Sequence, residues 1–379
     1  MFKLLSLPFV LFLSLFTLTV DATDYRLNKT VIPINQSVHL NLFPDKDSFS
    51  GNTNIKIKIT NKTKFIKLHG QQLTIRGASL LSSGDQKQKL RISFDTKHNF
   101  LILESDNELE KGNYDLNLIF SGQYRNDGSG LFKIKQNKTF HIYSQFQPML
   151  ARTVFPLFDE PEFKIPFEFS ITTKPDFTVL ANTPMKTVEE TNSFKTFYFL
   201  ESAPLYPDVL AIAVGNFEKH TIPIKGIDSN LYTSKGDSTV GVTTLSDISK
   251  LYLATQKYFG MTYPYSKLDI LALADYSAAA MENAGLITIQ KEYLNDLSAD
   301  GDKKAFALKL LAHEIIHQWF GNLVTFRWWD DLWLNESFSE WLAHKVVVKL
   351  YPEMTHYLTP AQEVSIAHDI TSPIKVRKN

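Results

Sequence analysis

The chain of 379 residues contains no cysteine, carries no net charge, and shows neither low-complexity tracts nor repeats of fixed period. Without cysteine there is no disulfide framework, so the stability of the fold has to come from packed cores and bound metal. Basic and acidic residues each number 40, so no broad field exists that would attract nucleic acid or an anionic membrane. The lack of repeats excludes a solenoid or a propeller, and a hydrophobic content of 44% is ample for two or three globular domains.

The N-terminus has the pattern of a targeting segment. Lys3 supplies a positive charge, residues 4–20 are apolar, and residues 20–22 (VDA) offer small side chains at a cleavage site. We therefore predict a signal peptide over residues 1–22 and a mature chain that begins near Thr23. The alternative is an uncleaved anchor that tethers the protein to a membrane through residues 4–20. In both cases we expect the chain in the secretory pathway, outside the cell or on the outer face of the plasma membrane.

Four Asn-x-Ser/Thr sequons agree with that location, because such asparagines are glycosylated on the surface of secreted proteins. All four lie in the N-terminal half, at Asn28, Asn35, Asn61 and Asn137. The sequence therefore predicts a glycoprotein that loses mass on glycosidase treatment.

The N-terminal half of the chain has the hydrophobic period of β-strands. Ile55, Ile57 and Ile59 alternate with polar residues, and similar runs recur at residues 114–120 and 195–200. This pattern predicts an all-β domain over residues 23–220, built as a sandwich or a saddle-shaped sheet.

After about residue 220 the period changes to that of helices. Residues 245–259 and 302–320 are amphipathic and are followed by Gly260 and Gly321, which are typical of helix ends. A third helix is expected over residues 331–350, where a proline soon follows. Residues 268–273 read as a short buried strand. We therefore predict a second domain of mixed α and β structure over residues 221–379.

The second of these predicted helices carries an H-E-x-x-H motif. A spacing of four places His313 and His317 on one face of the helix, one turn apart, as ligands of a single Zn²⁺ ion require. The alternative is that both histidines belong to an apolar core stripe with residues such as Phe306 and Leu310 and are simply hydrogen-bonded.

A third ligand is expected from the next helix. Glu336 lies 19 positions after His317, and a helix-turn-helix of that length would return its carboxylate to the two histidines. Two histidines and one glutamate form the ligand set of catalytic zinc and leave a fourth position for water. Glu340, one turn further along, is the alternative ligand.

Glu314 is the predicted general base. It lies between the two histidines of the motif without being a ligand, and zinc brings the pKa of its water near 7. A carboxylate within hydrogen-bond reach can then take a proton from this water and pass it to the leaving amine. This interpretation implies peptide hydrolysis without a covalent intermediate.

Residues 313–338 (HEIIHQWFGNLVTFRWWDDLWLNESF) closely resemble the zinc aminopeptidase family of aminopeptidase N. Residues 279–283 (AAMEN) resemble that family's G-A-M-E-N motif, and residues 145–147 (QFQ) and 158–161 (FDEP) also match, in family order. The resemblance implies a thermolysin-like α+β zinc-peptidase domain behind the β-domain.

The resemblance also assigns roles. It implies one zinc ion held by His313, His317 and Glu336, with Glu314 as the base, and a substrate that is a peptide with a free N-terminus. Glu282 would receive the α-ammonium group, since an acceptor-only carboxylate forms a charge-assisted pair with a cation. The implied substrate-binding residues are Gln147, Ala279, Ala280, Met281, Glu282 and Asn283.

The sequence departs from the family pattern at three positions. Ala279 replaces the first glycine of G-A-M-E-N and adds a methyl group where backbone would approach the substrate closely. Ala284 replaces an aromatic residue, and Ser337 replaces a glycine. The sequon that Ser337 creates at Asn335 is not expected to carry a glycan, because the glycan would collide with the zinc site.

The region after the predicted ligand helix is short. In the resembled family a tyrosine that stabilises the oxyanion lies further downstream, and neither Tyr351 nor Tyr357 is assigned that role. We therefore expect a C-terminally truncated chain that is a weak or inactive catalyst. The competing functions are a peptide-end binding protein that keeps zinc but turns over little, and an epoxide-hydrolysing relative.

Overall fold

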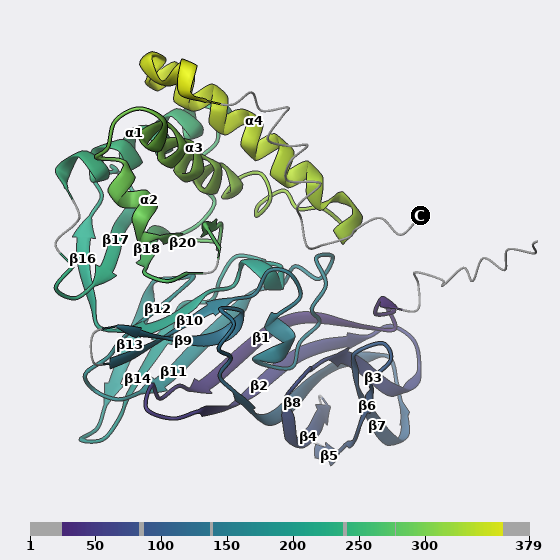
Figure 1. Ribbon diagram of the computed structural model, residues 1–379. Coiled ribbons are helices and arrows are strands. Elements are labelled where there is room, and N and C mark those ends of the chain that lie inside the picture. The colour runs from purple at the N-terminus through teal and green to yellow at the C-terminus, as the bar shows by residue number, and fades with distance from the viewer. Residues whose placement is uncertain (1–24, 83–86, 137–138, 238–240, 277, 359–379) are drawn as a thin grey trace, which may run out of the picture.

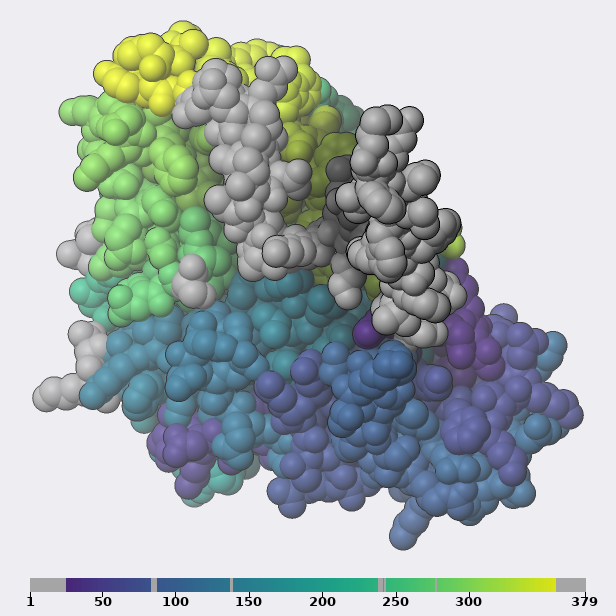
Figure 2. All heavy atoms as spheres, turned by 45° about the vertical axis from the view of Figure 1, so that its right-hand side comes forward, coloured from purple at the N-terminus to yellow at the C-terminus, as the bar shows by residue number. Residues whose placement is uncertain are grey.

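The computed structural model describes residues 25–82, 87–136, 139–237, 241–276 and 278–358. An N-terminal region of strands lies below a C-terminal region that carries the long helices (Figure 1). The same two bodies, purple to blue and green to yellow, are stacked in the space-filling view (Figure 2). The predicted signal peptide, the sequon at Asn137 and the last residues of the chain lie outside the described residues.

The N-terminal region consists of three sheets. The largest has eight strands in the order β13-β14-β11-β1-β2-β8-β4-β5, a second has the order β12-β15-β10-β9, and a third has the order β3-β7-β6. Neighbouring strands are antiparallel except for β1 and β11, which run parallel. The strands are β1 (Val31–Asn41), β2 (Ser48–Ile59), β3 (Thr63–His69), β4 (Thr74–Ser82), β5 (Lys87–Lys89), β6 (Arg91–Asp95), β7 (Phe100–Leu109), β8 (Gly112–Gln123), β9 (Gly130–Gln136), β10 (Thr139–Gln145), β11 (Phe167–Thr173), β12 (Thr178–Ala181), β13 (Met185–Glu190), β14 (Lys195–Phe199) and β15 (Ile212–Gly215).

The alternation read from the sequence is present in β2. Ile55, Ile57 and Ile59 are at most 1% exposed, whereas Lys56 and Lys58 between them are exposed. Because successive side chains of a strand point to opposite faces, β2 presents one face to the core and the other to solvent. The period-two prediction for the N-terminal half is confirmed.

Within its described residues the C-terminal region combines one sheet with four α-helices. The sheet has the order β16-β17-β18-β20-β19, and its central strand β18 is buried along its whole length and parallel to both neighbours. The predicted buried strand and the mixed α and β character are confirmed. The elements are β16 (Phe217–Thr221), β17 (Asp228–Ser234), α1 (Val242–Phe259), β18 (Lys267–Leu273), β19 (Ala280–Met281), β20 (Leu286–Gln290), α2 (Lys291–Asp296), α3 (Asp302–His317) and α4 (Leu332–Leu350). The predicted domain boundary at residue 220 falls within β16.

The helix ends follow their sequence signals with one correction. α1 ends before Gly260, which has the left-handed φ of 64° expected of a glycine cap. α3 ends at His317 and not at residue 320 as predicted. The amide groups of Gln318 and Trp319 bond to carbonyls three residues back, so the chain tightens into a turn before Gly321.

A continuous core joins the two regions. Phe146 and Tyr206 from the N-terminal region belong to the same buried cluster as Met281, Phe326 and Trp329 from the C-terminal region. A second cluster lies between α1, α3, α4 and the sheet of the C-terminal region. None of the described helices is long and apolar enough to cross a membrane.

Candidate metal centre and substrate site

α3 places the two histidines of the H-E-x-x-H motif on the face that looks toward α4. The Nε2 atoms of His313 and His317 lie 2.8 Å apart, and the His317 side chain is 1% exposed. The opposite face of α3 packs into the core through Leu308, Leu311 and Ile315. Phe306, which the apolar-stripe alternative placed beside the histidines in the core, is 44% exposed and does not belong to that stripe.

Glu336, in the first turns of α4, completes a three-residue cluster. Its Oε2 atom lies 3.3 Å from His313 Nε2 and 3.6 Å from His317 Nε2. The three ligand atoms all lie within 4.8 Å of one another. Zinc bonds to histidine nitrogen and carboxylate oxygen are about 2.0 to 2.2 Å long, so atoms at these separations can share one ion. The residues therefore fit a zinc ion.

The second nitrogen of each histidine has an acceptor nearby. His317 Nδ1 lies 3.2 Å from the carbonyl oxygen of Phe320 and 3.3 Å from Ser339 Oγ. His313 Nδ1 lies 3.4 Å from Glu340 Oε2, and the other carboxylate oxygen of Glu340 accepts from Lys309 Nζ at 2.6 Å. The acceptors at His317 Nδ1 favour a proton on that nitrogen and leave its Nε2 free to bind metal, and the Glu340 carboxylate lies within ion-pair distance of His313 Nδ1.

These contacts decide between the two candidate ligands on α4. Glu340 faces His313 Nδ1 and Lys309, whereas Glu336 faces the Nε2 atoms of both histidines. Glu340 is therefore placed to orient His313, and Glu336 is placed to bind the metal.

The cluster is balanced by opposite charges. Burial disfavours the charged form of His313, but its hydrogen bonds to Glu336 and Glu340 hold its pKa well above the ordinary range. Burial would raise the pKa of the Glu336 carboxyl, but the attraction of His317 and the hydrogen bonds with both histidines hold it well below its ordinary range. A divalent cation at the two Nε2 atoms would take the place of these protons.

Glu314 lies beside the cluster and is 4% exposed. Its Oε2 atom is buried and has no hydrogen-bond partner among the described residues. Burial raises the pKa of this carboxyl to about 8, against the attraction of His313, and the negative charges of Glu282 and Glu336 add to the rise. A buried acceptor without a partner is costly, so this oxygen is available for a donor that approaches the metal cluster.

The predicted amine-binding residues meet across the boundary of the two regions. Gln147, which follows β10, donates from Nε2 to Glu282 Oε1 at 3.2 Å. Glu282 is 6% exposed. Burial raises the pKa of its carboxyl above the ordinary value, against the positive charges of His317 and His313. The backbone carbonyl of Glu282 accepts hydrogen bonds from Gln318 and Asn322, so this residue lies beside the segment that follows His317.

The other residues of the AAMEN motif have different surroundings. Ala279 and Ala280 are half-buried at the edge strand β19, and the Ala279 carbonyl accepts from the Gln290 amide at 2.9 Å. Met281 is 1% exposed and belongs to the core. Asn283 is fully buried and donates to Thr288 Oγ1 at 3.3 Å. Within the described part of the chain, Glu282 is therefore the residue of the motif whose side chain bonds to Gln147.

Sequence reasoning missed two residues at the C-terminal end of α3. Gln318 and Asn322 are fully buried, and both donate to the backbone carbonyl of Glu282, at 2.9 and 2.7 Å. Their place within the segment that resembles the family is the only sequence signal that pointed to them.

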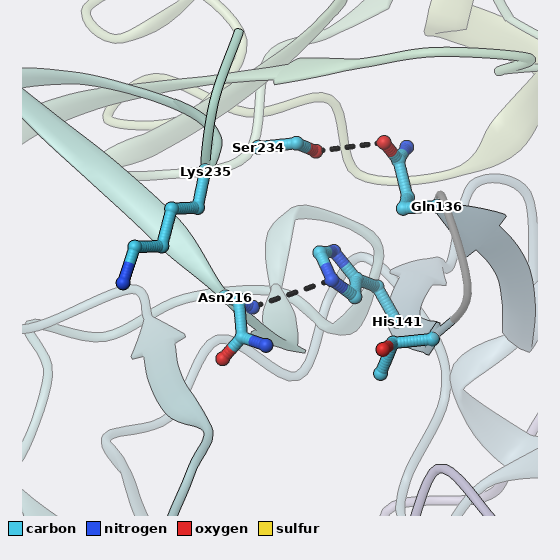
Figure 3. A pocket seen from close by; sticks show the side chains of 6 residues that line it. Gln136, His141, Asn216, Ser234 and Lys235 are labelled. Atoms are coloured by element: carbon cyan, nitrogen blue, oxygen red, sulfur yellow. Dashed lines mark hydrogen bonds between the residues drawn. The ribbon is translucent and has the colours of Figure 1, made fainter.

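A separate hollow lies away from this centre. It measures about 200 Å³ and is lined by residues from β9, β10, β16 and β17 and their ends, where Ser234 donates to Gln136 and Asn216 donates to His141 (Figure 3). None of its lining residues belongs to the metal cluster or the AAMEN motif.

Two family models match successive parts of the chain. The Peptidase M1 N-terminal domain matches residues 32–205, and the Peptidase family M1 domain matches residues 244–375. The first match runs from β1 to β14 of the N-terminal region, and the second contains the metal cluster and the AAMEN motif.

Individual relatives carry aminopeptidase names. Aminopeptidase M1-C of Oryza sativa subsp. japonica is 32% identical over 324 residues, which cover 83% of this chain and 37% of the relative. Glutamyl aminopeptidase of Bos taurus is 31% identical, with 85% and 35% covered. Puromycin-sensitive aminopeptidase of Caenorhabditis elegans is 31% identical, with 88% and 36% covered. The chain thus spans 35% to 37% of the length of these relatives.

Proposed function

This chain belongs to peptidase family M1, the family of aminopeptidase N, and from that premise we propose that it is a zinc aminopeptidase that removes N-terminal residues from peptides. The family is in general zinc-dependent. The observation that carries the proposal is the cluster of His313, His317 and Glu336, together with the unpartnered carboxylate oxygen of Glu314 and the carboxylate of Glu282, whose charges act on one another. We assign one zinc ion per chain to this cluster.

A bound zinc ion would polarise the peptide carbonyl and lower the pKa of water in the site. The Oε2 atom of Glu314 then accepts a proton from the attacking water, whose oxygen bonds to the carbonyl carbon. The same carboxyl returns the proton to the amide nitrogen as the peptide bond breaks. The products are a free amino acid and a peptide shortened by one residue, and no bond to the protein forms.

Glu282 and Gln147 supply the chain-end specificity. Because Gln147 donates to one oxygen of Glu282, the second carboxylate oxygen and the side-chain carbonyl of Gln147 remain as acceptors. A substrate ammonium group has three donors and a positive charge, which matches two acceptors and one negative charge. A peptide interior offers only a neutral amide, so this pair favours chain ends.

The secretory location is part of the proposal. Asn28 and Asn61 are exposed and Asn35 is half-buried, which supports glycosylation at these sequons. Asn335 is 4% exposed beside Glu336, so a glycan there would not fit. The predicted signal segment, or a membrane tether through residues 4–20, is proposed from the sequence pattern alone.

A second candidate function is peptide-end binding with little turnover. It is compatible with the position of the two tyrosines that follow the ligand helix. Tyr351 donates to Asp247 Oδ1 at 2.7 Å in the core beside α1, and Tyr357 lies against Gly301 at the start of α3. Neither is placed to donate to an oxyanion at the metal cluster, and one such donor contributes about a hundredfold to a thousandfold to turnover.

The proposal is tested with one peptide in two forms. We expect cleavage of a peptide with a free N-terminus and no cleavage after acetylation, because a neutral amide cannot form the charge-assisted pair with Glu282. Comparable rates on the two forms would refute aminopeptidase specificity. Binding of the free peptide without detectable cleavage would favour the second candidate function.

A further inference from the structure

Gln318 directly follows the second histidine of the metal cluster, and its side-chain amide is completely engaged. Its Nε2 atom donates to the carbonyl oxygen of Glu282 at 2.9 Å and lies 3.4 Å from that of Asn283. Its Oε1 atom accepts from the backbone amide of Gly285 at 3.0 Å and from the Tyr263 hydroxyl at 3.1 Å. One side chain from the end of α3 therefore bonds to the backbone on both sides of residue 284.

Asn322 adds a second donor from the same turn. Its Nδ2 atom donates to the Glu282 carbonyl at 2.7 Å, and its backbone amide donates to the His317 carbonyl at 3.0 Å. The backbone of Glu282 is thus joined by two amide side chains to the segment that carries His317.

The far end of segment 282–285 is held by other elements. Asn182 donates to the Ala284 carbonyl at 2.8 Å, and Lys267 donates to the Gly285 carbonyl at 2.9 Å. Gly285 has a φ of 71°, and a Cβ atom there would lie 2.4 Å from the Asn182 carbonyl oxygen. The segment therefore has little freedom to move while Gln318 and Asn322 are in place.

We propose that Gln318 is a positioning residue that fixes the Glu282 carboxylate relative to the metal cluster, and so sets which peptide bond lies at the metal when the substrate's ammonium group is bound. This inference rests on the proposed aminopeptidase function and deepens it. The Gln318 side chain bonds to protein groups and is not one of the three candidate metal ligands: its donor half holds the carbonyls of residues 282 and 283, and its acceptor half holds the amide of residue 285. Removing the donor half alone loosens Glu282 from α3 while the acceptor half is kept.

The substitution Gln318→Glu removes only the donor half and keeps the size of the side chain. We would combine it with Glu314→Gln, so that peptide is bound without being turned over, in the zinc-loaded chain of 379 residues. Calorimetry then gives the dissociation constants of trialanine and of N-acetyl-trialanine. The ratio of the two dissociation constants measures how strongly the site prefers a free ammonium group. Zinc content and thermal unfolding show whether each variant is folded.

In the Glu314→Gln parent we expect trialanine to bind at least about tenfold more tightly than its acetylated form, since a charge-assisted pair is formed only with the free amine. Adding Gln318→Glu should lower that ratio to within about threefold of unity while zinc is kept. The matched control is Gln36→Glu, which makes the same change in a glutamine that is 1% exposed and that donates to Thr53 and Pro156 in the N-terminal region. The control should keep the parent's ratio.

The possible outcomes separate the two claims. If the Glu314→Gln protein binds trialanine and N-acetyl-trialanine equally well, the aminopeptidase proposal is overturned and the positioning role with it. A large parent ratio that survives Gln318→Glu, or that falls equally in Gln36→Glu, overturns the positioning role alone. Should Gln318→Glu fail to fold, Asn322→Asp removes the other donor to Glu282 and is read by the same ratio: a fall supports the positioning of Glu282 from α3, and an unchanged ratio overturns it.

Discussion

The eight-stranded sheet and the C-terminal end of α3 both contain fully buried side chains, but the end of α3 buries polar groups beside its apolar ones. In β2 the buried positions are isoleucines and the polar residues between them face outward. In α3 and the turn that follows, Glu314, His317 and Gln318 are 4%, 0% and 0% exposed. Apolar burial stabilises the fold by itself, whereas buried polar groups need partners or a ligand. The sheet is therefore a scaffold, and the end of α3 is where chemistry is expected.

The strongest test of this contrast is the substitution Glu314→Gln. The amide has nearly the same shape but cannot take a proton from water, so we expect turnover of a free peptide to fall by about a hundredfold or more. Zinc content and thermal stability should stay near those of the wild type. Glu292→Gln on the exposed side of α2 is the control and should leave turnover unchanged. An unaltered rate in Glu314→Gln would remove the base from the mechanism.

The opposite result is expected in the sheet. Ile57 is fully buried, so Ile57→Ala should lower the free energy of unfolding by about 2 to 5 kcal/mol through lost burial and a residual cavity. Folded protein should still bind zinc and cleave peptide at the wild-type rate. Its exposed neighbour gives the control, because Lys58→Ala should change stability by less than about 0.5 kcal/mol. Denaturant unfolding measures both, and equal effects would contradict the assigned register of β2.

A smaller effect is expected one contact away from the metal. Glu340→Gln removes the charge that orients His313 and pairs with Lys309, so zinc affinity should fall by about tenfold to a hundredfold. Competition with a chelator measures this affinity, and Glu353→Gln at an exposed position is the control. Zinc that is lost completely would instead make Glu340 a ligand and reverse the assignment of the two glutamates.

A different kind of effect, on stability against pH, is expected in the N-terminal region. Burial raises the pKa of Glu160 from 4.5 to about 7, against a hydrogen bond from the Leu27 amide and the charges of Arg152 and Arg26. The folded state therefore binds a proton that the unfolded state has released, so stability falls as pH rises from about 4.5 to about 7, at up to about 1.4 kcal/mol per pH unit. Above that window the contribution is constant.

Glu160→Gln should remove this slope when the free energy of unfolding is measured at several values between pH 5 and pH 8. Glu162→Gln is the control. Burial alone would raise the pKa of Glu162, but hydrogen bonds from Lys29 and Arg327 lower it below its ordinary value. Glu162 stays ionised in both states over this range, so its replacement should leave the slope as in the wild type. Equal slopes in all three proteins would show that Glu160 stays ionised in the core.

The difference between the two regions also explains what the sequence could predict. The period of β2 and the four-residue spacing of His313 and His317 are local patterns, and each fixes which side chains share a face. Glu336 could be expected because its helix is the next α-helix after α3, joined to it by residues 318–331. In contrast, Gln318 bonds to residues about 35 positions earlier, and Gln147 reaches Glu282 across 135 positions. Such contacts depend on how separate elements pack, and no local pattern encodes them.

The end of α3 lies three residues before the predicted end at residue 320, and α1 begins three residues before its predicted start at residue 245. The amphipathic pattern runs on to Phe320, but Gln318 leaves the helix and bonds to the 282–285 segment. Tertiary hydrogen bonds replaced the last turn of the helix at the point where the candidate site is built. Departures of this kind are expected at functional sites, where local preference and chemistry conflict.

The most direct test of the account is the zinc content of the folded chain by elemental analysis. We predict one zinc ion per chain in the wild type and in Glu314→Gln, and almost none in His313→Ala and in Glu336→Ala, because only the latter two lose a ligand. Substoichiometric zinc that is the same in all four proteins would contradict the assignment of this cluster as the metal centre.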